Sequence, residues 1–154
     1  MGSVDFVVNG ARHVFDGDGN TSLLEVLRDT LGLKGSRLGC GANQCGACFV
    51  LVDGAVAASC DTPLWAVHNK SVTTVEGLGR PGSPHPLQAA FIAEQAAQCG
   101  YCTSGILIAA AGLLARCPKP NEDDIRSALG RNLCRCGSHN RVIRAVLRAS
   151  GQAV

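Results

Sequence analysis

The stretch "GCGANQCGAC", residues 39–48, holds three cysteines and three glycines within ten positions. A disulfide uses two thiols and would leave the third unpaired, whereas a metal site accepts three when a fourth ligand comes from elsewhere. Cys60 supplies a fourth thiol after eleven intervening residues. Intervals of four residues, then two, then a longer gap are the plant-type pattern of a 2Fe–2S cluster. We expect its ligands to be Cys40, Cys45, Cys48 and Cys60.

The glycines of this loop favour a cluster over a simpler metal site. Gly39, Gly41 and Gly46 allow sharp turns and let backbone N–H groups approach sulfur atoms. Hydrogen bonds of that kind help to set the reduction potential of an iron–sulfur cluster. A structural zinc site with four cysteines is the alternative, but zinc usually takes two C-x-x-C units. Zinc therefore fits this spacing less well.

A second set of cysteines lies in "QCGYC" and "NLCRC". Each of these pairs stands at the end of an expected helix, so each presents two thiolates toward one point. The spacing alone leaves two alternatives open here, a zinc site and a second 2Fe–2S cluster. The four candidate ligands are Cys99, Cys102, Cys134 and Cys136.

Hydrophobic periodicity divides the chain into two halves. Residues 1–76 predict strand, strand, helix, loop and three further strands, with tight hairpin turns at Asn9-Gly10 and Asp53-Gly54. Residues 77–86, "GLGRPGSPHP", have the composition of a linker. Residues 87–154 change to a helical period and predict a small bundle of four helices. The expected class is α+β, with a strand-rich domain followed by a helical one.

Charge and composition exclude several functions. The formal net charge of +2 is too small to indicate nucleic acid as a partner. No run of about 18 or more apolar residues is present, so we expect no direct membrane insertion. The first residues lack the pattern of a signal peptide, and nine cysteines are an odd number for a disulfide framework. These features predict a cytoplasmic protein, exported or membrane-associated only through a partner.

Taken together, "GCGANQCGAC" with Cys60, "QCGYCTSG" and "GRNLCRCGSHN" resemble a known family over nearly the whole chain. The sequence is similar to the small iron–sulfur subunit of the xanthine oxidase family of molybdenum hydroxylases. The resemblance implies an N-terminal β-grasp ferredoxin domain, a C-terminal four-helix domain and one 2Fe–2S cluster in each. It implies electron transfer without a catalytic residue in this chain, and it assigns the second cysteine set to the second cluster.

The same resemblance implies the partners. A separate large subunit would hold a molybdopterin, in its simple or its cytosine dinucleotide form, and pass electrons singly to the second cluster. The first cluster would pass them to a FAD-binding subunit, a c-type cytochrome or another acceptor. Gln98 matches the glutamine that hydrogen-bonds the pterin, and Cys136 matches the ligand nearest to it. No G-x-G-x-x-G unit is present, so we expect no flavin or nicotinamide in this chain.

Two positions depart from the commoner family pattern. Ser104 stands where proline often follows "CGYCT", and "CRCGSH" replaces the more usual "CRCTGY". Neither change removes a ligand. The glycine after "CRC" resembles small subunits of nicotinate- and isoquinoline-type dehydrogenases, which points to an N-heteroaromatic substrate, with an aldehyde as the other option. The rival functions are a freestanding ferredoxin or redox sensor and a two-zinc interaction module.

Four further features carry weaker expectations. We expect Cys117 to be a free thiol, buried or half-buried, and Trp65 to serve packing. His139 follows the last cysteine closely enough to meet the pterin or the partner. Arg141, Arg144 and Arg148 share one helical face, which predicts a solvated stripe or a docking surface.

Overall fold

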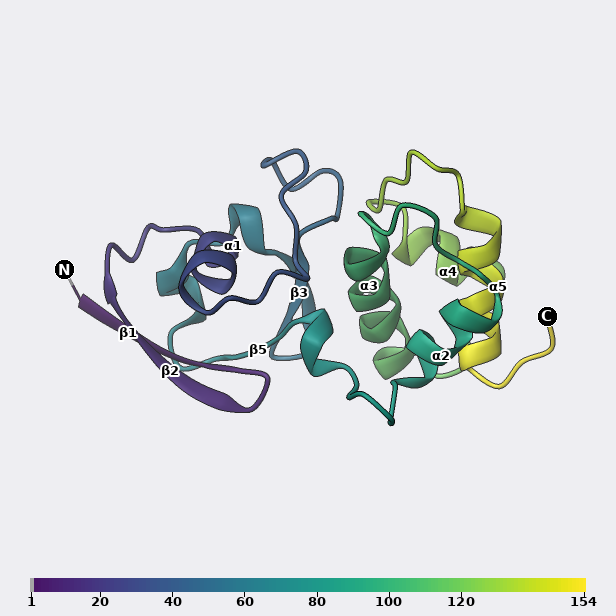
Figure 1. Cartoon of the computed structure of the whole chain (residues 1–154), viewed down its shortest axis with the longest axis horizontal. Helices are drawn as coiled ribbons and strands as arrows, with labels where there is room; N and C mark the ends of the chain where they lie inside the picture. The colour runs from purple at the N-terminus through teal and green to yellow at the C-terminus, as the bar shows by residue number, and fades with distance from the viewer. Residues whose placement is uncertain (1) are drawn as a thin grey trace.

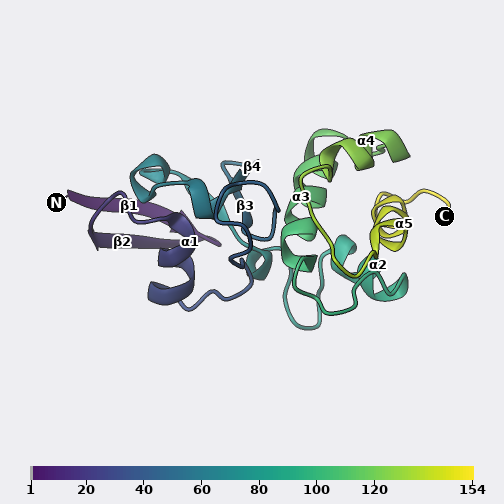
Figure 2. The same cartoon turned by 90° about the horizontal axis from the view of Figure 1, so that it is seen from above.

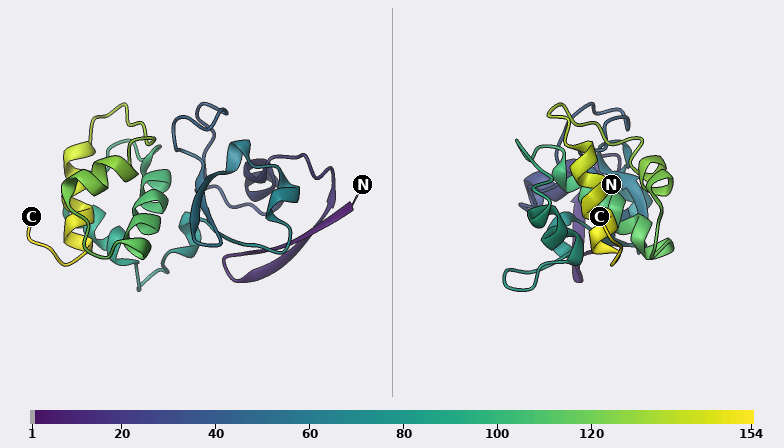
Figure 3. Two further views of the ribbon diagram at one scale, coloured as in Figure 1. Left: turned by 180° about the vertical axis from the view of Figure 1, so that it is seen from behind. Right: turned by 90° about the vertical axis from the view of Figure 1, so that its right-hand side faces the viewer.

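The computed structural model describes residues 2–154 and places a sheet-containing half beside a helical half (Figure 1). The two chain ends lie at opposite ends of the long axis. The segment 77–86 crosses on one side of the junction, whereas the loops before β3 and between α4 and α5 lie on the other. The same division is visible from behind in Figure 3. The α+β class expected from the sequence is confirmed.

The first half is built on a mixed five-stranded sheet with the order β2-β1-β5-β3-β4. β1 and β5 are parallel neighbours at the centre, while the other pairs are antiparallel. The strands are β1 (Gly2–Val8), β2 (Ala11–Gly17), β3 (Phe49–Val52), β4 (Ala55–Ala58) and β5 (Ser71–Thr73).

Both predicted hairpin turns are confirmed. Asn9 and Gly10 join β1 to β2 with φ of 50° and 84°, and Asp53 and Gly54 join β3 to β4 with φ of 48° and 83°. Two positive φ angles in a row define the hairpin turn whose twist matches that of the strands. Asn and Asp tolerate this conformation better than other non-glycine residues, which explains their presence at the first position.

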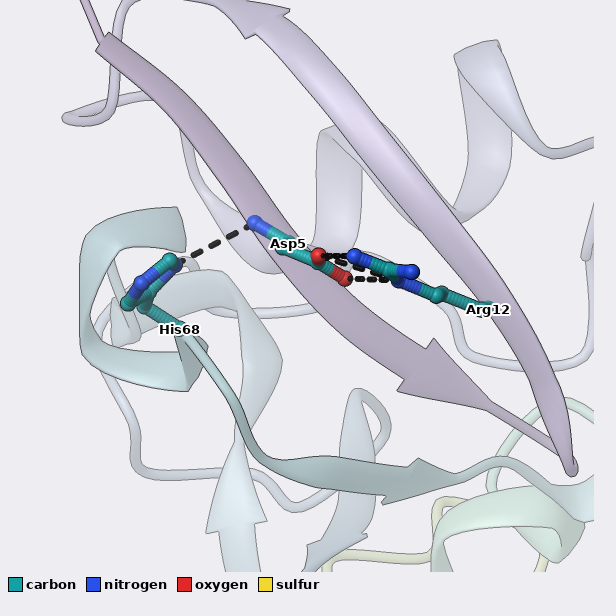
Figure 4. Close-up of polar contacts among 3 residues, drawn as sticks. All are labelled: Asp5, Arg12 and His68. Atoms are coloured by element: carbon teal, nitrogen blue, oxygen red, sulfur yellow. Dashed lines mark hydrogen bonds and ion pairs between the residues drawn. The ribbon is translucent and has the colours of Figure 1, made fainter.

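An ion pair crosses the hairpin at the edge of the sheet. The guanidinium of Arg12 on β2 donates to the carboxylate of Asp5 on β1, with Nε 2.9 Å from Oδ1 (Figure 4). This bond holds the pKa of Asp5 below its usual range. The backbone N–H of Asp5 donates to Nδ1 of His68 at 3.2 Å. The contact ties the middle of β1 to the turn before β5.

The helix expected after Thr21 forms in an unusual way. α1 (Leu23–Glu25) is capped by Ser22, whose hydroxyl accepts from the Glu25 N–H at 3.2 Å. The helix then widens into a π-helical segment over Val26–Thr30. Its buried face contributes Leu23, Val26 and Leu27 to the core under the sheet.

The second half contains the four expected helices, which are α2 (Pro86–Ala93), α3 (Thr103–Arg116), α4 (Glu122–Ala128) and α5 (His139–Ala149). Asn121 caps α4 by accepting from the Asp124 N–H at 2.9 Å. Every helix in residues 2–154 is too short or too polar to cross a bilayer. α3 lies at the junction and faces β3, as Figures 1 and 2 both show.

The arginine face of α5 is solvated, as expected, and it also contacts the end of α2. Arg144 and Arg148 donate from Nε to the carboxylate of Glu94 at 3.1 and 2.7 Å. Arg141 donates to the carbonyl of Gln95 at 3.3 Å. These bonds fasten α5 to the end of α2, while all three arginines stay exposed to solvent.

The packing role expected for Trp65 is also wrong, because 60% of the residue is exposed. Its ring lies outside the core that its neighbours Leu64 and Val67 enter. The four-residue turn Leu64–Val67 places two apolar side chains inward and leaves Trp65 on the opposite side.

The two halves share one continuous apolar contact. The core of the helices includes Cys48, Phe49 and Ala58 from the sheet half. Gly105 on α3 sits so close to the first half that an added Cβ would lie 1.9 Å from the carbonyl oxygen of Gly46. Only glycine fits this approach. The junction is therefore packed and does not act as a loose hinge.

Candidate metal centres

The outer part of the first cysteine loop is wrapped around sulfur. The amides of Ala42 and Gln44 donate to Sγ of Cys40 at 3.3 and 3.2 Å, and the Cys40 amide donates to Sγ of Cys45 at 3.4 Å. Gly41, with φ of 67°, makes the tight turn that this wrapping requires. The hydrogen bonds from Ala42 and Gln44 lower the pKa of Cys40 to about 7.

The inner part of the same site is a buried pair of thiols. Cys48 is 2% exposed at the start of β3, and the side chain of Cys60 lies against its thiol. Ser59 fixes this pairing, because its hydroxyl and its amide both donate to the Cys48 carbonyl, at 2.6 and 3.3 Å. Burial raises the pKa of Cys48 to about 11. The four cysteines thus form an outer pair, Cys40 with Cys45, and an inner pair, Cys48 with Cys60.

The second site repeats this arrangement with ligands from two loops. The exposed Cys99 accepts from the Tyr101 amide at 3.5 Å and lies against Cys136. The less exposed Cys102 lies against Cys134, and burial raises the pKa of Cys102 to about 12. The described contacts therefore place the eight cysteines in four thiol pairs, two in each predicted set.

The donor chemistry of both sites fits a two-iron cluster. A 2Fe–2S cluster takes four thiolates in all, and a pair of thiolates on each iron matches the pairs observed. The raised pKa values of Cys48 and Cys102 mean that these thiols ionise only when a nearby positive charge compensates, as bound iron would.

Backbone and side-chain hydrogen bonds join the two sites directly. The Leu133 amide, one residue before Cys134, donates to the carbonyl of Cys45 at 2.9 Å. Arg131 donates to the Asn43 carbonyl at 2.8 Å, and the Tyr101 hydroxyl donates to the Leu38 carbonyl. Sequence reasoning missed these contacts, because they join residues that are 63–88 positions apart.

The remaining candidate residues lie in different places. Gln98 is exposed beside the second site, where its side-chain amide donates to the Cys136 carbonyl at 3.5 Å. His139 is exposed at the first position of α5. Cys117 is a half-buried free thiol, as expected, at the far end of α3. A helix of 14 residues is about 21 Å long, which keeps Cys117 away from Cys102 at its start.

Comparisons with known proteins agree with this geometry. Residues 6–73 match the family of 2Fe–2S iron–sulfur cluster binding domains, and residues 74–147 match that of [2Fe–2S] binding domains. One of the subunits of nicotinate dehydrogenase from Pseudomonas putida is 47% identical over 148 residues, which cover 96% of this chain and 94% of that protein. The alpha chain of isoquinoline 1-oxidoreductase from Brevundimonas diminuta is 47% identical, and the match covers 97% of this chain and 99% of that protein. The chain belongs to the iron–sulfur subunits of the xanthine oxidase family.

Solved structures extend the likeness to three dimensions. Quinoline 2-oxidoreductase from Pseudomonas putida matches with a TM-score of 0.91 and 36% identity, over 96% of the present chain and 91% of that one. Aldehyde oxidoreductase from Desulfovibrio gigas matches with a TM-score of 0.94 and 38% identity. That match covers 98% of the present chain but only 17% of the much longer aldehyde oxidoreductase chain. The iron–sulfur subunit therefore binds two 2Fe–2S clusters and transfers electrons.

Proposed function

We propose that this subunit carries electrons one at a time from a molybdopterin centre in a large partner subunit to an external acceptor. The second cluster, held by Cys99, Cys102, Cys134 and Cys136, receives them. The first cluster, held by Cys40, Cys45, Cys48 and Cys60, releases them. When bound, a 2Fe–2S cluster supplies a one-electron redox centre whose potential depends on hydrogen bonds to its sulfurs.

The observation that carries this proposal is the pairing of eight cysteines at two sites that are joined by hydrogen bonds. The outer and inner thiol pairs of each site supply four ligands, and the bond from Leu133 to Cys45 holds the two sites at a fixed separation. Two one-electron centres held at a fixed separation suit electron transfer between partners. A structural zinc module would not need its two metal sites to be close together.

The surface beside Cys99 and Cys136 is the side that we assign to the donor. Gln98 is exposed there and keeps its side-chain carbonyl free while its amide donates to the Cys136 backbone. A neighbouring pterin would find in Gln98 a hydrogen-bonding partner attached directly to the cluster loop. This favours the role that the family resemblance implies for Gln98 and Cys136.

The names of the relatives support a class of substrate for the whole enzyme. Nicotinate dehydrogenase, isoquinoline oxidoreductase and nicotine 6-hydroxylase, at 47%, 47% and 42% identity, all bear the names of N-heteroaromatic compounds. We infer that the large subunit oxidises such a compound, with an aldehyde as the second candidate. The molybdopterin would be of the simple or the cytosine dinucleotide form. A FAD-binding subunit or a c-type cytochrome would take the electrons.

The domain division follows from the same interpretation. We assign residues 1–76 to a β-grasp ferredoxin domain and residues 87–154 to a four-helix bundle. Segment 77–86 would be the linker, and all nine free cysteines suit the reducing cytoplasm. The packed junction at Gly105 supports a fixed arrangement of the two domains.

Purification of the tagged chain from its native cells tests the proposal. We expect a large subunit in constant ratio to co-purify, with molybdenum in that partner and about four irons with four acid-labile sulfides in the present chain, since two 2Fe–2S clusters contain that many. Iron without a companion or molybdenum would favour a freestanding ferredoxin. Zinc in place of iron would overturn the electron-transfer function.

A further inference from the structure

Ser138 occupies the N-cap position of α5 without capping the helix. A serine at this position normally accepts a hydrogen bond from a backbone N–H in the first turn. Ser22 does so on α1, and Asn121 does so on α4. The Ser138 side chain makes no such bond, although it is only 6% exposed. Its hydroxyl therefore makes a hydrogen bond outside the helix.

The hydroxyl of Ser138 faces a sulfur of the second site. Its Oγ lies 3.4 Å from Sγ of Cys134, which is within hydrogen-bond distance for sulfur. A cysteine that binds iron does so as a thiolate and has no proton to donate. In the loaded protein the hydroxyl must therefore be the donor and the sulfur the acceptor.

The backbone around Ser138 supports the same orientation. Gly137 has φ of 77°, which turns the chain sharply between the last cysteine and α5. The amide of Ser138 also faces Sγ of Cys134. Local negative charge on this sulfur is thus stabilised by residues of the "CGSH" segment.

We propose that Ser138 raises the reduction potential of the second cluster by donating a hydrogen bond to the Cys134 sulfur. Reduction adds negative charge to the cluster and its thiolates, so a donor at the sulfur stabilises the reduced form more than the oxidised form. A higher potential makes this cluster a better acceptor for an electron from the donor side. The inference rests on the proposed assignment of Cys134 as a ligand.

The hydroxyl can be removed without disturbing the other donors. The hydrogen bonds to Cys40 and Cys99 come from backbone amides, which side-chain substitutions leave in place. Ser138 instead contributes a side-chain donor. Ser138→Ala removes it, Ser138→Gly removes it while keeping a residue that suits an N-cap, and Ser138→Thr keeps the hydroxyl.

The test is a redox titration of the complete complex, followed by electron paramagnetic resonance so that the two clusters are read separately. We expect Ser138→Ala and Ser138→Gly to make reduction of the second cluster harder by about tenfold, which is about 59 mV toward negative potential for one electron. Ser138→Thr should restore the potential. Ser150→Ala, at the other end of α5, is the matched control, because the Ser150 hydroxyl donates to the Leu147 carbonyl and faces no cysteine.

A second readout separates a hydrogen bond from a packing effect. An exchangeable proton on the Ser138 hydroxyl should give a deuterium coupling to the reduced second cluster after transfer to heavy water, and both hydroxyl-free variants should lose it. An unchanged potential in these variants, or an equal shift in both clusters, would overturn the inference. Retention of the second cluster in Cys134→Ser would instead overturn the ligand assignment, so the two failures are distinguishable.

Discussion

The Leu133 backbone N–H donates a 2.9 Å hydrogen bond to the Cys45 carbonyl oxygen, linking the two cysteine loops. Cys45 is a proposed ligand of the first cluster, and Leu133 is bonded to Cys134, a proposed ligand of the second. The path between the two ligands therefore contains covalent bonds and one hydrogen bond. The relative position of the two sites is set by main-chain atoms, which side-chain substitutions do not remove.

The close approach of α3 to the first loop predicts the effect of a single methyl group. Gly105→Ala would place a Cβ 1.9 Å from the Gly46 carbonyl oxygen, and its three nearest atoms would all be backbone. We expect a loss of about 1–3 kcal/mol in unfolding free energy from overpacking, measured by thermal or denaturant unfolding. Gly19→Ala is the control, since its Cβ would meet nothing closer than the Trp65 Cβ at 3.5 Å, an ordinary contact distance. Equal stability of the two variants would contradict a packed junction.

Single ligand substitutions should separate the two clusters. Cys45→Ser should remove the paramagnetic signal of the first cluster and largely spare the second. Cys134→Ser should remove the second signal and block reduction of the first cluster by the substrate of the complex. Iron analysis and circular dichroism on the same samples check loading and folding. Loss of both signals from a folded single variant would mean that the cysteines do not form two separate sites.

Asn9 provides a prediction for the sheet half. Its side chain donates to Thr74 Oγ1 and accepts from the Thr74 N–H, both at 2.9 Å, and Thr74 is fully buried. Asn9→Gly keeps the positive φ but leaves the buried Thr74 N–H without its acceptor. We expect a loss of about 1–3 kcal/mol in chemical denaturation.

Asn69→Gly is the matched control for this hairpin variant. Asn69 also has a positive φ, of 59°, and it is exposed. Glycine there relieves the backbone without uncovering a buried group, so stability should change little or rise. If both glycine variants behaved alike, the side-chain bonds of Asn9 would contribute nothing measurable.

The ion pairs between α2 and α5 predict a dependence on pH. The hydrogen bonds from Arg144 and then Arg148 lower the pKa of Glu94 below its ordinary value of 4.5. A carboxylate with a lowered folded-state pKa stabilises the fold above the unfolded-state pKa, and this contribution disappears as pH falls through the folded-state value. Glu94→Gln should therefore lower the melting temperature slightly at neutral pH and make no difference in strong acid.

Melting curves across the acid range measure this effect. Glu122→Gln is the control, because Glu122 pairs only with Arg126 on the same exposed helix face. Such pairs contribute little to stability, so this variant should melt like the parent chain at every pH. A Glu94→Gln difference that persisted in strong acid would point to packing instead of charge.

Features with short-range causes were predictable from the sequence. The turns at Asn9-Gly10 and Asp53-Gly54 depend on residues that tolerate positive φ, and the Asn121 cap depends on one side chain and its own helix. The two sets of cysteines could also be recognised in the sequence, because the ligands of one cluster follow a restricted set of spacings along the chain. The structure shows the thiols of each set in pairs, and their assignment as cluster ligands stays a prediction.

Features with long-range causes were not predictable. The sequence carries no signal that Arg144 and Arg148 meet Glu94, because these residues are about fifty positions apart and become neighbours only when α2 and α5 pack. A large aromatic residue such as Trp65 usually contributes to a core, which is why packing is the natural expectation. The core around a short turn decides which of its side chains face inward. The exposure of Trp65 therefore could not be predicted from the sequence of the turn alone.

The main-chain link between Cys45 and Leu133 has a consequence for how the protein matures. Loading one loop with iron and sulfide orders the atoms that position the other loop, so each insertion lowers the ordering cost of the next. Thermodynamic linkage makes this effect mutual, whichever centre is filled first. A chain with one centre filled should therefore take up its second cluster more readily than an empty chain takes up its first.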